Sequence, residues 1–464
     1  MRNMSRCAST KALSIVFSVT LVVLLNSSCG LLAAWTSTPD DGAIWQVDAG
    51  PSDSTSNDFG SPPDHHVADR VALSDAAPDA GPSRDSATRD AAGTDATTIE
   101  AGGGVDGCSV GSVVAPGGLA PTGRIAVAAD DQGAAIAWAA VSGGATHVYA
   151  FHVDNNRVAS GPQSISDPGF APGQLTLAAS GGLFRAVWVD ANRMYSNGLT
   201  APSTRVNNPD VMLPGAAAAS PAIAPRGLAF GLVWIDSGTG APVLQYSSLS
   251  TAGGLQPPSF TLIAGNSPTT TALAGSGSDL GLVWSALDVN LGVDTFILFE
   301  SLSRDGTVSE SPTTVYQGPQ TAHCPAIAAA GAGDFGIVWR QANGMIDDTV
   351  LFSLVVGGDA ATSPVPIGNA PQASCDNGPN IAWNGSEFGV VYVEATTFTL
   401  QLIRLDSRGA AIGDPIPVPG IDSNSSTALT AQGDDFLVAG TSWAYIIVVQ
   451  LPATPVLVRV HCPQ

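Results

Sequence analysis

The larger, C-terminal part of the chain alternates between short runs of small apolar residues, turns that contain Gly, and strands that are apolar throughout. The clearest copy is the run Pro325–Ala330, the turn Gly331–Asp334 and the strand Phe335–Trp339. A pattern that returns at intervals of about 50 residues is the mark of a repeated β architecture. Equivalent strands end at positions spaced 46 to 55 residues apart: Trp138, Trp188, Trp234, Trp284, Trp339, Tyr392 and the degenerate Gly440.

Each repeat is expected to form four short strands, which we call A to D. Strand A has small side chains, as in Pro221–Ala224, and these suit a strand crowded around a central channel. Strand B, such as Phe230–Trp234, is apolar on both faces, so it must lie between neighbouring sheets. Strand C, such as Thr399–Leu405, alternates apolar and polar residues more regularly than strand B does. Strand D is interrupted by Pro, as in Ser363–Ile367, which an outer edge strand tolerates.

This pattern predicts an all-β fold. No segment after residue 30 has a sustained 3.6-residue period, so we expect almost no α-helix. Units of about 50 residues resemble the blades of β-propellers, and the 357 residues of 108–464 divide into seven units of 51. The sequence therefore predicts a seven-bladed β-propeller over 108–464, with six or eight blades as alternatives. The repeats resemble those of secreted bacterial lipoproteins, a family whose activity is mostly unassigned.

Residues 1–28 are predicted to be a lipoprotein signal peptide. Three basic residues precede the apolar run Ala12–Leu25, whose 14 residues suit a signal peptide better than a transmembrane helix. The run ends in Asn-Ser-Ser-Cys29-Gly30, which resembles a lipobox, although Asn26 stands where Leu is usual. The resemblance implies lipidation of Cys29 and, from Gly30, a place on the outer membrane, on its periplasmic or surface side. An ordinary cleavable signal peptide is the alternative.

Residues 29–107 have a different composition, dominated by Asp, Ala, Ser, Gly, Thr and Pro. They hold 14 acidic residues against three Arg, a net charge of −11, and few apolar groups. Such a stretch cannot offset the entropy of ordering, so we expect a disordered, extended tether. The whole chain carries −22, which becomes −25 without the three basic residues of the signal segment. That charge repels nucleic acid and anionic lipid, so membrane contact is expected through the lipid only.

Four cysteines lie beyond the tether, and an even number in an exported protein favours disulfide bonds. The first and the last lie at the two ends of the predicted ring, which must meet to close it. The two middle cysteines occupy equivalent positions in adjacent repeats. The predicted bonds are therefore Cys108–Cys462 and Cys324–Cys375.

A metal site is the alternative use of these cysteines, since His323 and His461 each precede one of them. No spacing in the sequence fits a zinc motif, however, and exported thiols oxidise. We therefore expect no metal.

Catalytic motifs are scarce. Gly331–Gly336 matches the dinucleotide-binding Gly pattern, but it precedes a strand and opens no helix. The sequence has no P-loop, nucleophile elbow, zincin His pair or EF-hand loop, so no cofactor is expected. Acidic residues recur in the A–B turns, as at Asp279, Asp334 and Glu387. Recurrence at one turn position indicates turn chemistry rather than the paired carboxylates of a glycosidase.

We therefore expect a monomeric, non-enzymatic scaffold that binds a protein or carbohydrate ligand. The alternative is a glycan-degrading enzyme, a glycosidase or a lyase, but the strand A cores contain no Asp or Glu to serve as channel-facing carboxylates.

The D–A and B–C connections share one face of the ring and vary between repeats, as binding loops do. The predicted recognition sector on that face, for which merely solvated loops are the alternative reading, consists of His323, Arg340, Asp347, Asp348 and Asp376.

Overall fold

A computed structural model describes residues 99–101, 107–114 and, with short gaps, 119–463. These residues belong to one compact unit, Arg89–Gln464. The predicted signal peptide, Cys29 and nearly all of the predicted tether lie outside the described residues. The gaps after residue 119 are 156–159, 170–171, 202–203, 208–209, 214–216, 239, 263–266, 278, 288–293, 304–307, 309–310, 332, 345, 443–444, 447–448 and 451–452.

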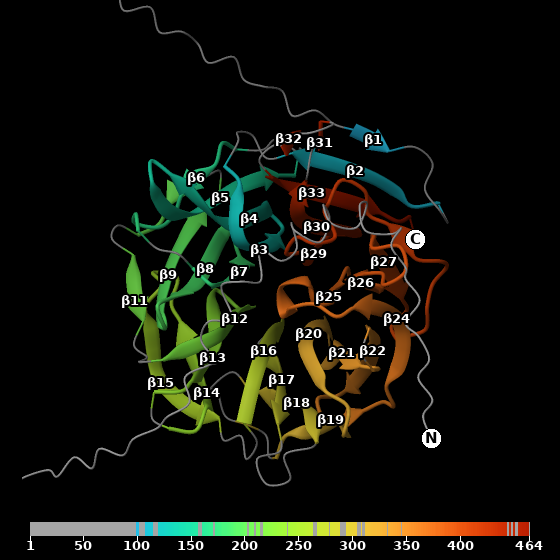
Figure 1. The fold of residues 1–464 in the computed structure, drawn as a ribbon. Coiled ribbons are helices and arrows are strands. Elements are labelled where there is room, and N and C mark those ends of the chain that lie inside the picture. The colour runs from blue at the N-terminus through green and yellow to red at the C-terminus, as the bar shows by residue number, and fades with distance from the viewer. Residues whose placement is uncertain are drawn as a thin grey trace, which may run out of the picture. The chain divides into compact units, whose positions relative to one another are not determined.

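Seven small antiparallel sheets form a ring, as Figure 1 shows. We number these blades one to seven in chain order, and the seven-bladed β-propeller predicted from the sequence is confirmed. The inner strands are β3 (Pro121–Asp130), β7 (Gln174–Ser180), β12 (Ala218–Arg226), β16 (Ser267–Ser276), β20 (Ala322–Gly331), β25 (Asn380–Trp383) and β29 (Ala428–Gln432). The second strands are β4 (Gly133–Ser142), β8 (Leu183–Asp190), β13 (Ala229–Asp236), β17 (Asp279–Leu287), β21 (Asp334–Ala342), β26 (Phe388–Val393) and β30 (Asp435–Ser442).

The outer half of each blade is less regular. The third strands are β5 (Ala145–Asp154), β9 (Arg193–Thr200), β14 (Val243–Leu249), β18 (Thr295–Leu302), β22 (Asp347–Val356), β27 (Leu400–Leu405) and β33 (Thr454–His461). The outermost strands are β6 (Gln163–Ser164), β10 (Thr204–Arg205), β11 (Val211–Leu213), β15 (Leu255–Leu262), β19 (Thr313–Gly318), β23 (Ala360–Ala361), β24 (Val365–Pro371), β28 (Ile416–Pro417), β2 (Ser109–Val114) and β1 (Ile99–Ala101). A separate hairpin joins β31 (Tyr445–Ile446) to β32 (Val449–Gln450).

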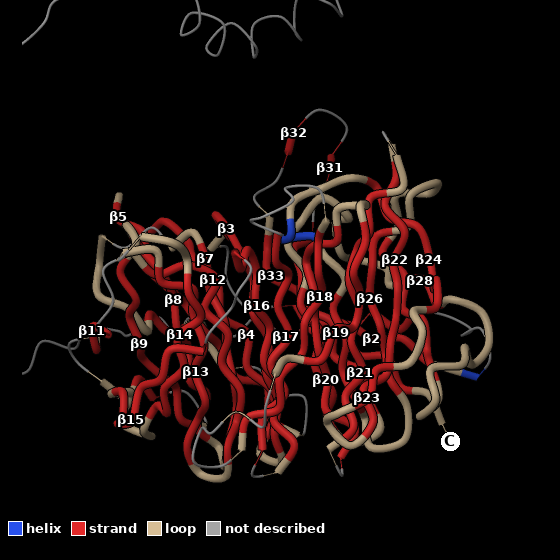
Figure 2. The backbone as a smooth tube through the Cα atoms, turned by 90° about the horizontal axis from the view of Figure 1, so that it is seen from below, coloured by secondary structure: helices blue, strands red, loops and turns tan. Residues whose placement is uncertain are grey.

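Helical structure is minimal, as the sequence predicts. The described residues contain no α-helix, and the 3-10 turn η2 (Cys375–Asn377) lies in the connection between blades five and six. No described helix is long and apolar enough to cross a membrane. Figure 2 shows the ring from its edge, with the loops gathered on its two faces.

The ring closes in blade seven, where the two ends of the propeller meet. Strand β2 pairs with β33, so that Ser109 lies opposite His461 (Figure 1). Blade seven therefore takes its inner three strands from the C-terminal end and its two outer strands, β2 and β1, from the N-terminal end. The Cys108–Cys462 bond joins the residues that flank this pair of strands. Both predicted disulfide bonds are confirmed, the second being Cys324–Cys375.

The second strands form the core between blades, as their apolar pattern predicts. Trp138 and Trp339, for example, are fully buried, and each packs against residues of the preceding blade. The Gly that recurs in these strands has a packing cause. A Cβ at Gly281 would lie 2.5 Å from the ring of Phe335 in the next blade, and one at Gly336 would lie 2.6 Å from the ring of Phe388. The neighbouring blade's aromatic ring therefore occupies the space of a side chain at this position.

Stability is expected to fall in mildly acidic solution because of His152. This residue is buried in blade one, 5.3 Å from the ring of Phe184 in blade two, and burial lowers its pKa from 6.5. The unfolded chain keeps the ordinary pKa, so it binds more protons than the folded chain as the pH falls through about 6.5. The free energy of unfolding therefore decreases as the pH falls from about 6.5 to the lowered pKa of His152 in the folded chain. The variant His152→Phe should flatten this part of a plot of urea midpoint against pH, and an unchanged slope would refute the assignment.

Candidate functional site

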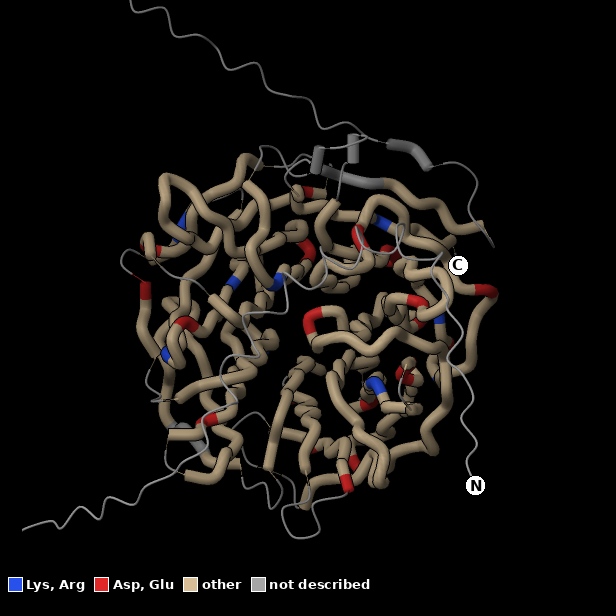
Figure 3. The backbone as a smooth tube through the Cα atoms, viewed as in Figure 1, with Lys and Arg blue, Asp and Glu red and all other residues tan. Residues whose placement is uncertain are grey.

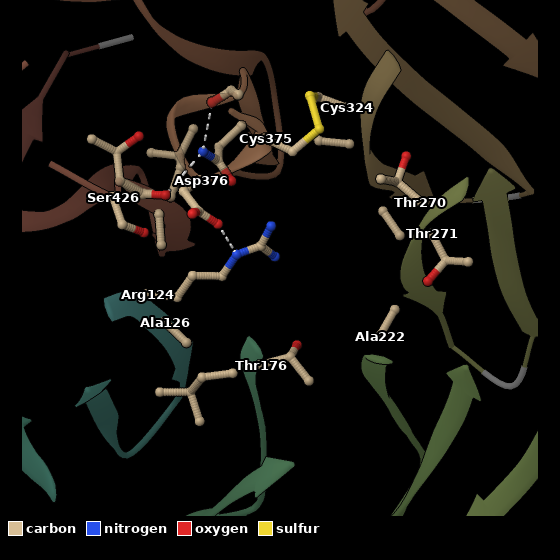
Figure 4. Close-up of a pocket in the computed structure, with 18 of the residues that line it drawn as sticks. Arg124, Ala126, Thr176, Ala222, Thr270, Thr271, Cys324, Cys375, Asp376 and Ser426 are labelled. Atoms are coloured by element: carbon tan, nitrogen blue, oxygen red, sulfur yellow. Dashed lines mark hydrogen bonds and ion pairs between the residues drawn. A yellow bond between two sulfur atoms is a disulfide. The ribbon is translucent and has the colours of Figure 1, made fainter. Parts of the chain in front are cut away.

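A cavity of about 270 Å³ lies at the end of the ring where the inner strands begin, and all seven blades contribute to its lining (Figure 4). We call this cavity the channel mouth. Its walls are mostly small apolar residues and hydroxyl groups, such as Ala126, Ala222 and Thr176. Charged residues are scarce along the inner strands (Figure 3), and the described lining contains two of them, Arg124 and Asp376. The cavity is therefore a small polar site in a largely uncharged channel.

Irregularities in the inner strands shape the channel mouth. Ser220 and Cys324 have φ values of 49° and 54°, which is uncommon for residues other than Gly. Each lies at a β-bulge, and a bulge bends its strand and turns side chains out of the regular alternation. Bulges occur near the start of the inner strand in four blades, between Pro121 and Ile125, Ala219 and Ala222, Pro268 and Thr270, and His323 and Ala326.

Contacts between blades hold the channel mouth in place. The backbone N–H of Thr271 donates to Ser220 Oγ over 2.9 Å and links blade four to blade three. The backbone N–H of Ile125 donates to Ser426 Oγ over 3.2 Å and links blade one to blade seven. The second disulfide bond links blades five and six at the same level (Figure 4). The polar groups of the mouth are therefore positioned before any ligand arrives.

An ion pair spans part of the channel mouth. Arg124 of β3 donates through its Nε to the carboxylate of Asp376 in η2 (Figure 4). The two side chains are 32% and 46% exposed, so both remain accessible. The other two guanidinium nitrogens of Arg124 point away from Asp376 into the cavity in this view. The pair thus fixes the arginine while leaving its Nη groups available to a ligand.

The predicted recognition sector divides into two parts. Asp376 lies at the channel mouth, and Asp347 is half-buried on β22, opposite Pro371. The other three residues form a cluster inside blade five, the first, His323, being half-buried. Its Nε2 lies 3.1 Å from Asp348 Oδ2, and Arg340 Nε lies 3.4 Å from the same oxygen.

Two members of the cluster are withdrawn from solvent, because the side chains of Arg340 and Asp348 are only 1% and 2% exposed. Burial lowers the pKa of His323, with Asp348 opposing this shift and Arg340 adding to it. Burial also lowers the pKa of Arg340, again opposed by Asp348. A role of these three residues in binding stays a prediction.

Sequence analysis missed Arg124. The signal was present, because Arg124 is a charged residue directly before the small apolar run Ile125–Ala129 of an inner strand. That Arg124 meets Asp376 depends on the ring, since the two are 252 residues apart in the chain.

The metal alternative is wrong for the cysteines, since all four are in disulfide bonds. Across the described residues, no group of three or more His, Cys, Asp or Glu side chains is placed to hold a metal ion. His461 instead contacts Asp435, with Nδ1 and Oδ1 2.6 Å apart.

No protein-family model matches this chain, and no curated protein matches it. Similar solved structures include the WD40 domain of SCAP from fission yeast, at 9% identity and a TM-score of 0.45, covering 76% of this chain and 98% of that one. An endo-arabinase from Bacteroides thetaiotaomicron is 11% identical with a TM-score of 0.34, covering 51% and 89%. A sialidase from Trypanosoma rangeli is 10% identical with a TM-score of 0.39, covering 66% and 56%. At these values the similarities say nothing about what this chain binds or catalyses.

Proposed function

We propose that this chain is a lipid-anchored β-propeller of the cell envelope that binds a ligand at the channel mouth. The observation that carries the proposal is the Arg124–Asp376 pair, held at a cavity to which every blade contributes. Backbone strain at non-Gly residues, as at Ser220 and Cys324, is concentrated in proteins at functional sites. Preorganised polar groups in a small concave site reduce the cost of ordering on binding.

Binding fits the channel mouth better than glycan hydrolysis does. Glycosidases of the usual kind need two carboxylic groups placed on either side of the scissile bond. The described lining offers one carboxylate, Asp376, and that group already accepts a hydrogen bond from Arg124. A glycan is still a suitable ligand, because the hydroxyl-rich lining and the Arg124 Nη groups suit a partner with many hydrogen-bonding groups.

The membrane part of the proposal rests on the lipobox-like sequence that ends at Cys29. An acidic tether of the composition found in 29–107 would hold the propeller away from the anchor. The ligand would then be met in the envelope or at the cell surface.

The test is a screen of the full chain in detergent against oligosaccharide and peptide arrays, followed by calorimetry of each hit. Arg124→Ala is expected to weaken a mouth-bound ligand roughly 10- to 100-fold, since a hydrogen bond to a charged group contributes about 1.5–3 kcal/mol. The melting temperature should change little, because a half-exposed ion pair contributes about 1 kcal/mol or less.

Arg193→Ala is the matched control, because Arg193 is exposed and lies outside the described lining of the mouth. Its affinity for the same ligand should equal that of the wild type. Equal binding by wild type and Arg124→Ala would refute the site. Hydrolysis of any glycan on the array would refute the binding function and favour the enzymatic alternative.

A further inference from the structure

Two arginines of the propeller are withdrawn from solvent without a carboxylate partner. Five of the nine described arginines lie within 4.0 Å of an Asp or Glu oxygen: Arg124, Arg205, Arg340, Arg404 and Arg459. Of the other four, Arg193 and Arg408 are exposed, whereas Arg185 is buried and Arg226 is half-buried. In a chain of net charge −22, uncompensated cations in sheltered positions need an explanation.

Arg185 breaks the repeat. It occupies the position in β8 that Gly231 and Gly281 hold in blades three and four, three residues before the Trp of the strand. Its side chain is fully buried, and its Nη2 donates to the carbonyl oxygen of Thr251 in blade three. Burial lowers its pKa to about 10, so it remains charged at neutral pH.

Arg185 Nε and Nη1 have no hydrogen-bond partner among the described atoms. Burying a cation in this way is unfavourable, and a carbonyl oxygen offsets little of that cost. The repeat therefore carries a destabilising residue at one position out of seven, which indicates a role for its charge.

Arg226 lies near the same turn, because Arg226 and Thr251 line one cavity. Its Nη1 donates to Tyr246 Oη over 2.5 Å and to Ser248 Oγ over 2.7 Å, both neutral partners. It lines a cavity of about 820 Å³ on the face opposite the channel mouth, where the A–B and C–D turns lie. The described lining holds no acidic residue.

We propose that this cavity, which we call the turn pocket, binds an oxyanion group of the phosphate or sulfate type. Arg226 would hold the anion directly, since a guanidinium presents several N–H donors in a geometry that matches such oxygens. Ser250, Thr251 and Gln256 also line the wall, and hydroxyl and amide side chains are donors of the kind that an oxyanion accepts. Arg185 acts through space, from behind the Thr251 carbonyl, by adding a positive charge in a medium of low dielectric constant.

The size of the turn pocket indicates that the anion is one end of a larger molecule. A phosphate fills only a small part of 820 Å³, which lies in the range of pockets for whole small ligands. Leu228, 81% exposed, and Ala229 provide an apolar contact beside the cationic end. A sugar phosphate or a sulfated sugar has both an anionic end and a larger body, and such a ligand suits a protein proposed to lie in the cell envelope. This site is independent of the channel mouth and needs neither Arg124 nor Asp376.

The first measurement is a phosphorus NMR titration of inorganic phosphate and of a hexose phosphate with the full chain in detergent at low ionic strength. Wild type is expected to bind both saturably, the hexose phosphate more tightly, and affinity should fall with added salt because of screening. Arg226→Ala should weaken binding roughly 10- to 100-fold, and Arg226→Lys should restore part of it. Arg408→Ala, which removes an exposed arginine, is the control and should bind as wild type.

Arg185→Met separates the charge of Arg185 from its volume. It should raise the melting temperature, because an apolar side chain of similar size replaces a buried cation, and it should weaken phosphate binding several-fold. Absence of saturable binding to wild type, or equal binding to Arg226→Ala, would overturn the turn pocket. Unchanged phosphate affinity in Arg185→Met would overturn the role given to that charge. Arg124→Ala should leave phosphate binding intact, so failure here and failure at the channel mouth are distinguishable.

Discussion

Cys29→Ser is expected to move the protein from the membrane pellet to the soluble fraction. Each buried CH₂ of an acyl chain contributes about 0.8 kcal/mol to membrane binding, so two or more chains make a stable anchor and their loss removes it. The measurement is fractionation of cells that express either form, with mass spectrometry of the N-terminal peptide for lipid on Cys29.

Cys7→Ser is the matched control for this experiment. Cys7 lies within the predicted signal peptide and would be absent from the mature protein. The variant should therefore fractionate with the membrane as wild type does. Retention of Cys29→Ser in the pellet after a high-salt wash would contradict the lipid anchor. A wild-type protein whose mature N-terminus carries no lipid would favour an ordinary cleavable signal peptide.

Removal of the Cys108–Cys462 bond should cost more stability than any other single change in the propeller. The bond closes a loop of 354 residues, for which chain entropy gives a stabilisation of up to about 6 kcal/mol. It also fixes β2 on β33, the pairing that closes the ring. The variant with Ser at both positions should unfold at a clearly lower urea concentration, and amides of β2 should exchange with deuterium before those of the other blades.

The Cys324–Cys375 bond provides the comparison. It closes a loop of 51 residues between adjacent blades, so chain entropy gives about 4 kcal/mol, and its loss leaves the closure of the ring intact. Its double Ser variant should therefore unfold at a higher urea concentration than the variant that lacks Cys108 and Cys462. The reverse order would show that blade seven is held by strand pairing alone.

Much of the ring could be predicted because every repeat shows the same pattern of apolar strands and turns. The two-sided apolar pattern of strands such as Phe335–Trp339 places them between sheets, and the burial of Trp339 follows from that. The spacing of those strands gives the number of blades. Equivalent positions in adjacent repeats, and the two ends of a ring, are close in any propeller, so both disulfide bonds followed from the sequence as well.

What the sequence by itself determined is therefore the period, the order of strands within a blade and the pairing of the cysteines. These depend on local patterning and on the closure of a ring, neither of which needs exact coordinates. The sequence pattern did not predict that β2, from the N-terminal end, forms an outer strand of blade seven. That pairing depends on which edge of blade seven remains open.

Only the tertiary structure decided which side chains meet. Bulges of one or two residues near the start of the inner strands set what faces the channel, and they bring Arg124 to Asp376 across blade seven. His323, Asp348 and Arg340 likewise close on each other in the interior of blade five. Arg185 of blade two and Arg226 of blade three come near one turn because neighbouring blades pack face to face. A shift of one residue in strand register reverses the face of every side chain, and the repeat pattern does not encode such shifts.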